Sequence, residues 1–179
     1  MKTITSKSGK KITFRSLQED DLEEMYKYAK KIEAEDTFIT LNPAEPLSLK
    51  EEKDYFLGSL KKINKTKLVK LLVLDEEKII GACDIEILGK RQNHVGNFGI
   101  ALLKDYRSEG IGFKLAKHII KLSKQKLNIS QIILSCFANN TIGIKYYKKL
   151  GFTQYGSHPK AILYQDKLVD QVFFYKNIK

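Results

Sequence analysis

The chain has 179 residues, 42% of them hydrophobic and 30% charged, and no window approaches the roughly 18 uninterrupted apolar residues of a membrane span. The start of the chain lacks the apolar stretch of a signal peptide, so we expect one cytoplasmic domain over residues 1–179 with no membrane partner. The formal net charge of +11 would suit a polyanionic partner, but most basic residues are lysines spread over the whole length, which favours a solvated surface over a nucleic-acid footprint.

The first part of the sequence indicates one strand and two helices. Polar and apolar residues alternate over Lys11–Arg15, which is typical of a half-buried strand. Ser16 and Glu19 have the spacing of a capping box, so we expect a helix to begin there. The apolar residues that follow in the sequence have helical spacing. After a loop that contains prolines, Ser48 and Glu51 form a second capping box and open the next helix.

Apolar stretches in the middle of the chain predict three consecutive strands, at Leu68–Leu74, Ile79–Leu88 and His94–Leu103. The connections between them are short polar turns, which leave no room for a crossover helix. We therefore expect these strands to form an antiparallel meander.

The remaining sequence completes a mixed sheet. We expect helices over about residues 109–127 and 141–150, and strands over Ile132–Phe137, Phe152–Tyr164 and Leu168–Tyr175. Only the strand–helix–strand step from His94 to Phe137 demands a parallel pair, through a right-handed crossover. The predicted fold class is therefore α/β (α+β), with a twisted, mixed, mostly antiparallel sheet of about seven strands and helices on both faces.

The stretch from Gly99 to Gly112 has the pattern of an anion site. An apolar strand runs into a polar turn and then into a helix that opens with Arg107-x-x-Gly110-x-Gly112. A helix start leaves main-chain N–H groups unpaired and carries partial positive charge, and glycines let it approach phosphate oxygens closely. Walker A and dinucleotide-binding patterns do not match. The stretch favours a nucleotide cofactor with its pyrophosphate on this turn, although two glycines at a helix start are often only a tight turn.

A second stretch, Asn140–Phe152, follows the next predicted strand directly. Asn140, Ile144 and Tyr147 lie at helical spacing on one face, which can point back at the end of that strand. Together the two stretches resemble the GNAT superfamily of acetyl-CoA-dependent N-acetyltransferases. The first is similar to its Q/R-x-x-G-x-G/A loop, and the second to its N-x-x-A-x-x-x-Y-x-K-x-G-F pattern, with Gly143 at the alanine position.

The resemblance implies a single N-acetyltransferase domain with acetyl-CoA as co-substrate and no metal ion. In this family the strand equivalent to Phe98–Leu103 splays away from the strand at Ile132–Phe137, and the pantetheine arm lies in the gap. A main-chain N–H near Leu102 would stabilise the negative charge that develops on the thioester carbonyl. The residues expected to contact the cofactor are Leu102, Leu103, Lys104, Arg107, Ser108, Glu109, Gly110, Ile111, Gly112 and Asn140.

The same resemblance implies catalytic roles. The amine attacks the thioester directly, and Tyr147 matches the family's general acid, which protonates the departing CoA thiolate. The general base is open, because Asn97 stands where some relatives have a glutamate. Glu86 on the neighbouring strand is the preferred carboxylate, Asp84 shares its face, and His94 is a further candidate. Both carboxylates can equally face solvent.

The acceptor is expected to be a small primary amine. In the family, the first two helices and the loop at Thr37–Leu47 form the wall on the amine side, and no ring of carboxylates indicates a polyamine. Alternatives stay open: acetylation of a protein or peptide N-terminus, a basic nucleic-acid-binding domain, or a CoA-binding sensor without turnover. The oligomeric state, monomer or homodimer, is also open. Candidate acceptor contacts are Phe38, Ile39, Thr40, Tyr155 and Tyr164.

Overall fold

A mixed sheet of eight strands forms the centre of the computed structural model, which describes residues 1–178. The strands lie in the order β1-β2-β3-β4-β5-β6-β8-β7, and every neighbouring pair is antiparallel except β5 and β6. Within these residues no helix is both long and apolar enough to cross a bilayer. The elements in chain order are β1 (Lys2–Thr5), β2 (Lys11–Ser16), α1 (Leu22–Ala34), α2 (Leu49–Asn64), β3 (Leu68–Asp75), β4 (Lys78–Gly89), β5 (Gln92–Leu102), a short 3₁₀ helix (Lys104–Tyr106), α3 (Ile111–Leu127), β6 (Gln131–Phe137), α4 (Thr141–Lys149), β7 (Thr153–Tyr164) and β8 (Lys167–Asn177).

The predicted sheet is confirmed with one strand more than expected. The antiparallel meander of β3, β4 and β5 and the parallel step from β5 to β6 are as predicted. The extra strand is β1, which pairs with β2 at the edge of the sheet and is mostly exposed. Ile4 is its only apolar residue, so no periodic pattern marks it in the sequence.

The capping box predicted at Ser16 and Glu19 is wrong. Ser16 ends β2, and α1 begins only after Asp21. The buried Asp21 carboxylate accepts hydrogen bonds from the guanidinium of Arg15 at 2.6 Å and from the main-chain N–H of Gln18 at 2.7 Å. Because these contacts hold the chain in a non-helical turn, the helix starts later than the local pattern suggests.

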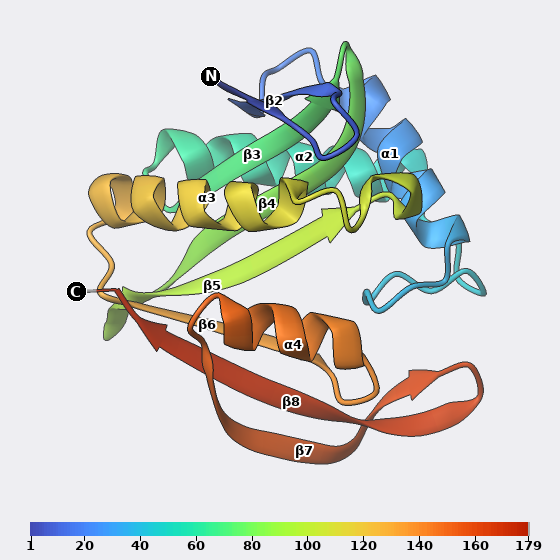
Figure 1. Cartoon of the computed structure of the whole chain (residues 1–179), viewed down its shortest axis with the longest axis vertical. Helices are drawn as coiled ribbons and strands as arrows, with labels where there is room; N and C mark the ends of the chain where they lie inside the picture. Colours follow the sequence, from blue (N-terminus) through green and yellow to red (C-terminus); the bar gives the residue numbers. More distant parts are fainter. Residues whose placement is uncertain (179) are drawn as a thin grey trace.

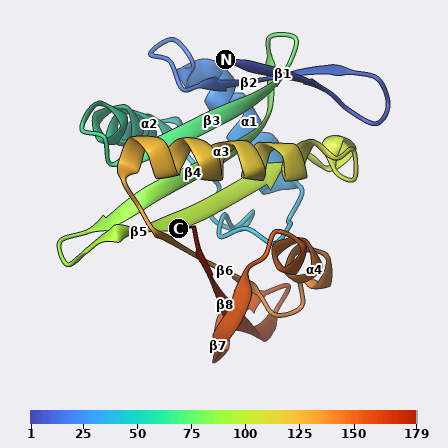
Figure 2. The ribbon, with the colours of Figure 1, turned by 60° about the vertical axis from the view of Figure 1, so that its left-hand side comes forward.

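Helices cover the sheet from both sides. Figure 1 shows α3 in front of β3 and β4, with α1 and α2 behind the sheet, and Figure 2 shows the same arrangement from another side. The second predicted capping box is confirmed, since Ser48 and Glu51 each accept from the other's main-chain N–H. On α1, the Tyr28 hydroxyl donates to the Ala101 carbonyl at 3.1 Å, which holds this helix over the end of β5.

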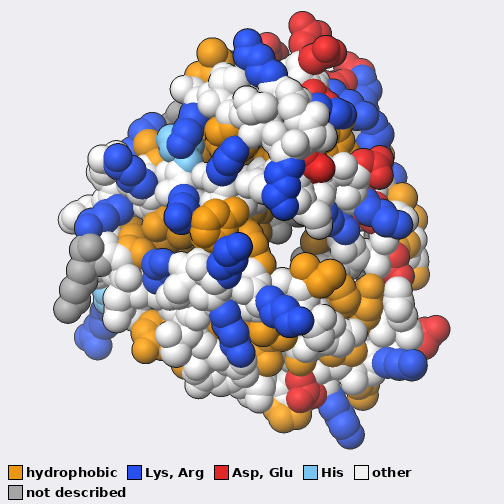
Figure 3. Space-filling view, viewed as in Figure 1, with side chains coloured by type: hydrophobic (Ala, Val, Ile, Leu, Met, Phe, Trp, Pro, Cys, Tyr) orange, Lys and Arg blue, Asp and Glu red, His pale blue; other side chains and the backbone are white. Residues whose placement is uncertain are grey.

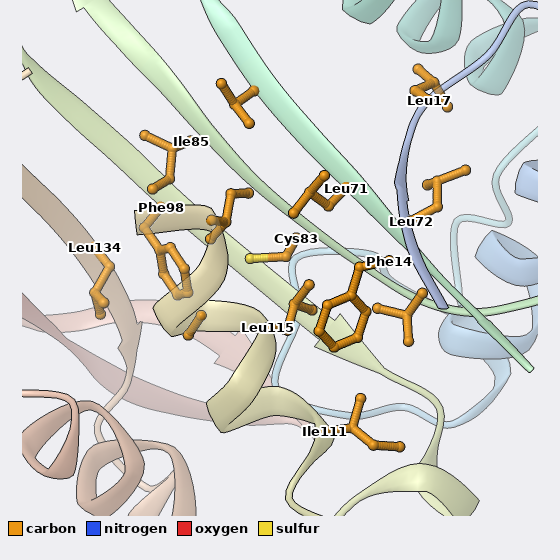
Figure 4. Close-up of a cluster of buried hydrophobic side chains, with 14 of the residues drawn as sticks. Phe14, Leu17, Leu71, Leu72, Cys83, Ile85, Phe98, Ile111, Leu115 and Leu134 are labelled. Atoms are coloured by element: carbon orange, nitrogen blue, oxygen red, sulfur yellow. The ribbon is translucent and has the colours of Figure 1, made fainter. Parts of the chain in front are cut away.

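Apolar side chains between α3 and the sheet form much of the core. Ile111, Leu115 and Ile119 recur at helical spacing and are at most 1% exposed. Figure 4 shows Ile111 and Leu115 beside Phe14, with Cys83 nearby on the sheet. Each such side chain stabilises the fold by about 1.5–3 kcal/mol when fully buried. This packing fixes the start of α3 relative to the end of β5.

The sheet divides between β5 and β6. These strands pair only at Val95–Gln131, Gly96–Ile132 and Asn97–Ile133, and β5 continues to Leu102 without β6 beside it. Figure 1 shows the two strands diverging toward their carboxyl ends, with α4 over β6 and β8. The splay implied by the family resemblance is therefore present.

Candidate active site

Two cavities on opposite faces of the sheet meet where β5 and β6 diverge. The α3 cavity, of about 430 Å³, lies between the starts of α3 and α4, and the α1 cavity, of about 700 Å³, lies against α1 and α2. Figure 3 shows the surface hollowed near its centre, with Lys and Arg side chains around the opening. The residues that line both cavities are Phe38, Ile39, Ile100, Ala101 and Tyr147. The gap between β5 and β6 thus joins the two spaces.

The start of α3 turns its main-chain N–H groups toward the α3 cavity. Gly110 is the N-cap residue, at φ 77°, and no side chain caps the helix. This left-handed conformation favours glycine and explains Gly110. Gly112 is different, because a Cβ there would make only ordinary contacts, the nearest at 3.4 Å from Leu102 Cδ1. The fold does not need a glycine at position 112, so the missing side chain leaves room for a ligand, and a helix start of this kind suits phosphate.

Arg107 is tied to neighbouring residues. Its Nε donates to the Leu102 carbonyl at 2.9 Å, and its guanidinium pairs with Glu35 just after α1. The main-chain N–H of Lys104 donates to the same carboxylate at 2.7 Å. Arg107 still lines the α3 cavity, but Glu35 neutralises part of its charge, so its main effect is to hold the turn in place. Lys149 adds another cation to the lining.

The first turn of α4 closes the other side of the α3 cavity. The Asn140 side chain caps the helix by accepting from the Gly143 N–H at 2.8 Å. A Cβ at residue 143 would lie 2.5 Å from Asn140 Nδ2, so the Asn140 side chain adopts this capping conformation beside a glycine. Tyr146 packs against the core, lines the cavity and donates to the Gly112 carbonyl at 2.9 Å. This bond ties α4 to the start of α3.

Tyr147 lies where the two cavities meet. Its ring is packed against Phe98, Phe152 and Phe174, with centroids 6.4, 6.2 and 6.0 Å away. Burial raises the pKa of the Tyr147 phenol, so the hydroxyl keeps its proton at neutral pH. Tyr147 lines both cavities, so its hydroxyl can donate a proton to a group that lies between them.

A buried ion pair lies in the wall of the α1 cavity. The Lys70 side chain is 3% exposed, and its Nζ is 3.6 Å from Asp84 Oδ2. Asp84 faces Gly99 across the sheet, where a Cβ would come within 3.1 Å of Asp84 Oδ1, so the glycine makes room for the carboxylate. Burial raises the pKa of the Asp84 carboxyl, and the Lys70 charge partly offsets this. A carboxylate with a raised pKa is a better proton acceptor.

The predicted cofactor residues divide into two groups. Leu102, Arg107, Ser108, Gly110, Gly112 and Asn140 line the α3 cavity, whereas Leu103, Lys104, Glu109 and Ile111 do not. Leu103 and Ile111 are core residues, because their side chains point into the apolar layer. Glu109 turns to the N-terminal segment, where it accepts from the Ser8 N–H at 2.8 Å.

The predicted acceptor contacts are partly brought together. Phe38 and Ile39 line both cavities, and Thr40 lines the α1 cavity. Tyr164 lines neither; it packs against Phe38 at 5.2 Å and donates to the Asp36 carbonyl, and so supports the loop from behind. Tyr155 is 57% exposed and packs on β8.

Glu86 lies outside both cavities, unlike Asp84. It forms a surface ion pair with Lys62 of α2 at 2.8 Å. Glu86 pairs with Asn97, where β5 and β6 are still joined, whereas Asp84 is opposite Gly99, where the strands have separated. His94 is exposed and lines neither cavity.

Several lining residues were not predicted. Phe113, Ile142, Gly143 and Lys149 line the α3 cavity, and Glu52, Tyr55 and Lys70 line the α1 cavity. One had a signal in the sequence: Lys70 is the only charged residue before Asp75 in the apolar strand β3.

Comparison with known proteins agrees with this geometry. The Acetyltransferase (GNAT) family matches residues 19–152. The L-amino acid N-acetyltransferase AaaT of Escherichia coli (strain K12) is 29% identical over 96 residues, which cover 53% of this chain and 59% of that protein. The crystal structure of an acetyltransferase of the GNAT family from Streptococcus pneumoniae has a TM-score of 0.83 at 23% identity, covering 94% of this chain and 99% of that one. RimL, a ribosomal L7/L12 alpha-N-protein acetyltransferase in complex with coenzyme A, has a TM-score of 0.77 at 15% identity, covering 93% and 94%. The chain belongs to the GNAT acetyltransferase family.

Proposed function

We propose that this chain transfers the acetyl group of acetyl-CoA to a primary amine. The observation that carries the proposal is the meeting of the α3 and α1 cavities in the β5–β6 gap, with Tyr147 in both linings. A direct transfer, without an enzyme nucleophile, requires the amine nitrogen and the thioester carbon to be held next to each other in line for attack. The family match supports acetyl-CoA as one of them, as does CoA in the RimL structure.

The α3 cavity is the place for CoA. The main-chain N–H groups at the start of α3 suit its diphosphate, and the charge of Lys149 adds to the attraction. The pantetheine arm would lie along β5 beyond Asn97, where the edge facing β6 has no strand partner. This path leads from Gly112 to Tyr147.

The acceptor amine would reach the thioester from the α1 cavity. A bond forms between its nitrogen and the acetyl carbon, and the bond from that carbon to sulfur breaks. Asp84, in place of Glu86, accepts the proton that the ammonium loses, directly or through water. Tyr147 donates its phenolic proton to the departing sulfur, and the second proton that the nitrogen loses on becoming an amide restores the phenol. Both groups lie in the cavity walls. The raised pKa of Asp84 favours its acceptance of a proton, and the raised pKa of Tyr147 keeps the phenol protonated until the thiolate departs.

The proposal is tested by incubating the protein with acetyl-CoA and a panel of amines and peptides, and measuring the release of free thiol. We expect release with at least one primary amine, and CoA binding by calorimetry in the absence of acceptor. Faster acetylation of peptide N-termini than of free amines would assign the chain to protein acetylation. A folded protein that binds no CoA at millimolar concentration would refute the proposal.

A further inference from the structure

Glu52 is a buried carboxylate with an unused hydrogen-bonding atom. It lies in the first turns of α2 and is 4% exposed. Its Oε1 has no hydrogen-bond partner among residues 1–178, although the residue lines the α1 cavity. Ser123 Oγ is the other such buried atom in this part of the chain, and Ser123 lines neither cavity. A buried acceptor without a donor is unfavourable, so Glu52 Oε1 marks a position where a ligand can supply the donor.

The neighbouring cations and donors are already engaged. Lys70 Nζ donates to the Tyr55 hydroxyl at 2.7 Å and pairs with Asp84. Glu51, the next carboxylate on α2, accepts from the Ser48 N–H as part of the capping box. The charged groups of this wall are therefore two carboxyls, the buried Glu52 and the partly buried Asp84, against the single cation of Lys70. This imbalance favours a cationic ligand group over an anionic one.

The strand order gives the distance between this position and the reacting centre. Lys70 of β3 pairs with Asp84 of β4, and Asp84 pairs with Gly99 of β5. Neighbouring strands lie about 4.8 Å apart, so β3 is about 10 Å from β5. Glu52 lies on α2, which packs against β3, and it lines the α1 cavity together with Lys70, so Glu52 is near the β3 end of this row. An acceptor that reaches both Glu52 and the β5–β6 gap must be elongated.

The geometry points to a linear aliphatic diamine as the acceptor, with one nitrogen acetylated in the β5–β6 gap and the second ammonium donating to Glu52 Oε1. This inference rests on the proposed function and adds the substrate class. Asp84 lies between the two ends and takes the proton of the reacting nitrogen, whereas Glu52 binds only the remote one. Glu52 is therefore a specificity residue.

The test compares three acceptors of similar length that differ at the remote end: 1,5-diaminopentane, pentylamine and 5-aminopentanoate. We expect the wild-type kcat/KM for the diamine to exceed that for pentylamine by about 10- to 100-fold, the usual range for a hydrogen bond to a charged group. The aminopentanoate should be the poorest, because its carboxylate faces Glu52. In Glu52→Gln the ratio of kcat/KM for the diamine to that for pentylamine should fall to near one.

The matched control is Asp54→Asn, which removes a carboxylate from the exposed side of the same helix and should keep the wild-type preference. Equal wild-type use of pentylamine and the diamine would overturn the inference and leave the acetyltransferase proposal intact, and it needs no variant to fold. A preference for 5-aminopentanoate would also overturn it and would assign Lys70 as an anion anchor. Absence of turnover with every amine, despite CoA binding, would instead count against the proposed function.

Discussion

Replacing Gly112 with alanine should separate the stability of the fold from the binding of CoA. The new Cβ would meet Leu102 Cδ1 at 3.4 Å, Tyr146 Oη at 3.7 Å and Ile100 Cδ1 at 3.9 Å, all ordinary contacts. Alanine is favoured over glycine in helices by up to about 1 kcal/mol, so in this first turn we expect a gain of about 0.5 kcal/mol and a Tm higher by about 1–2 °C. The Cβ would, however, occupy room beside the N–H groups that face the diphosphate. Because the family's loop pattern allows glycine or alanine at this position, we expect CoA binding to weaken by only about two- to tenfold.

Calorimetric titration with CoA and thermal unfolding of the same samples measure both effects. Gly58→Ala is the control, because Gly58 lies in α2 and a Cβ there would have no atom within 4 Å. It should raise the Tm in the same way and leave CoA affinity unchanged. If Gly112→Ala binds CoA as tightly as the wild type, the start of α3 does not hold the diphosphate, and the placement of CoA in the α3 cavity is wrong.

Four further substitutions test the catalytic groups and the start of α1. Tyr147→Phe should lower kcat by about 10- to 1000-fold with little change in CoA affinity, measured by thiol release and calorimetry; wild-type turnover would remove the residue from the mechanism. Asp84→Asn should lower kcat/KM least at low pH and most above the pKa of the Asp84 carboxyl, because the raised pKa leaves the wild-type carboxyl protonated as the pH falls, and a protonated carboxyl is as unable to accept a proton as the amide. Glu86→Gln should leave the pH profile unchanged, and the reverse result would restore Glu86 as the base. Asp21→Asn should lower the free energy of unfolding by about 3 kcal/mol in urea, because it leaves Arg15 without its partner in a largely buried pair; a change below about 1 kcal/mol would mean that this pair does not hold the turn before α1.

The two stretches that identify the family could be read from the sequence because each is local. The glycine pattern from Arg107 to Gly112 depends on backbone conformation within one turn, and Gly110 does adopt the left-handed φ that the pattern implies. The helix after Asn140 is set by its own cap. The splay of β5 from β6 was not visible in any residue. The family resemblance implied this splay. The structure shows that it begins after Asn97, where the parallel pairing of β5 and β6 ends.

The choice between Asp84 and Glu86 could not be made from the sequence. Side chains alternate between the two faces of a strand, so residues 84 and 86 lie on the same face of β4, and the sequence pattern predicts the same environment for both. Their difference arises one strand away, where β5 is still joined to β6 beside Asn97 but is free beside Gly99. It also arises from α2, whose Lys62 reaches Glu86. Register and helix placement are non-local, and the short-range pattern that predicts strands carries no information on either.

Lys70 could have been recognised as a site residue from the sequence, although the strand pattern alone does not identify it. A lysine at the centre of a strand buried on both faces must either lose its charge or be compensated by carboxylates on the elements that cover it. In β3 the remaining residues before Asp75 are apolar, so the lysine by itself implies acidic partners on the neighbouring strand and on the helix above. Asp84 and Glu52 are those residues, and only Asp84 forms an ion pair with it. Lys70, the polar residue that interrupts an apolar run, therefore indicates where the wall of the α1 cavity lies. Glu52 Oε1 in this wall has no donor, and a ligand could supply one.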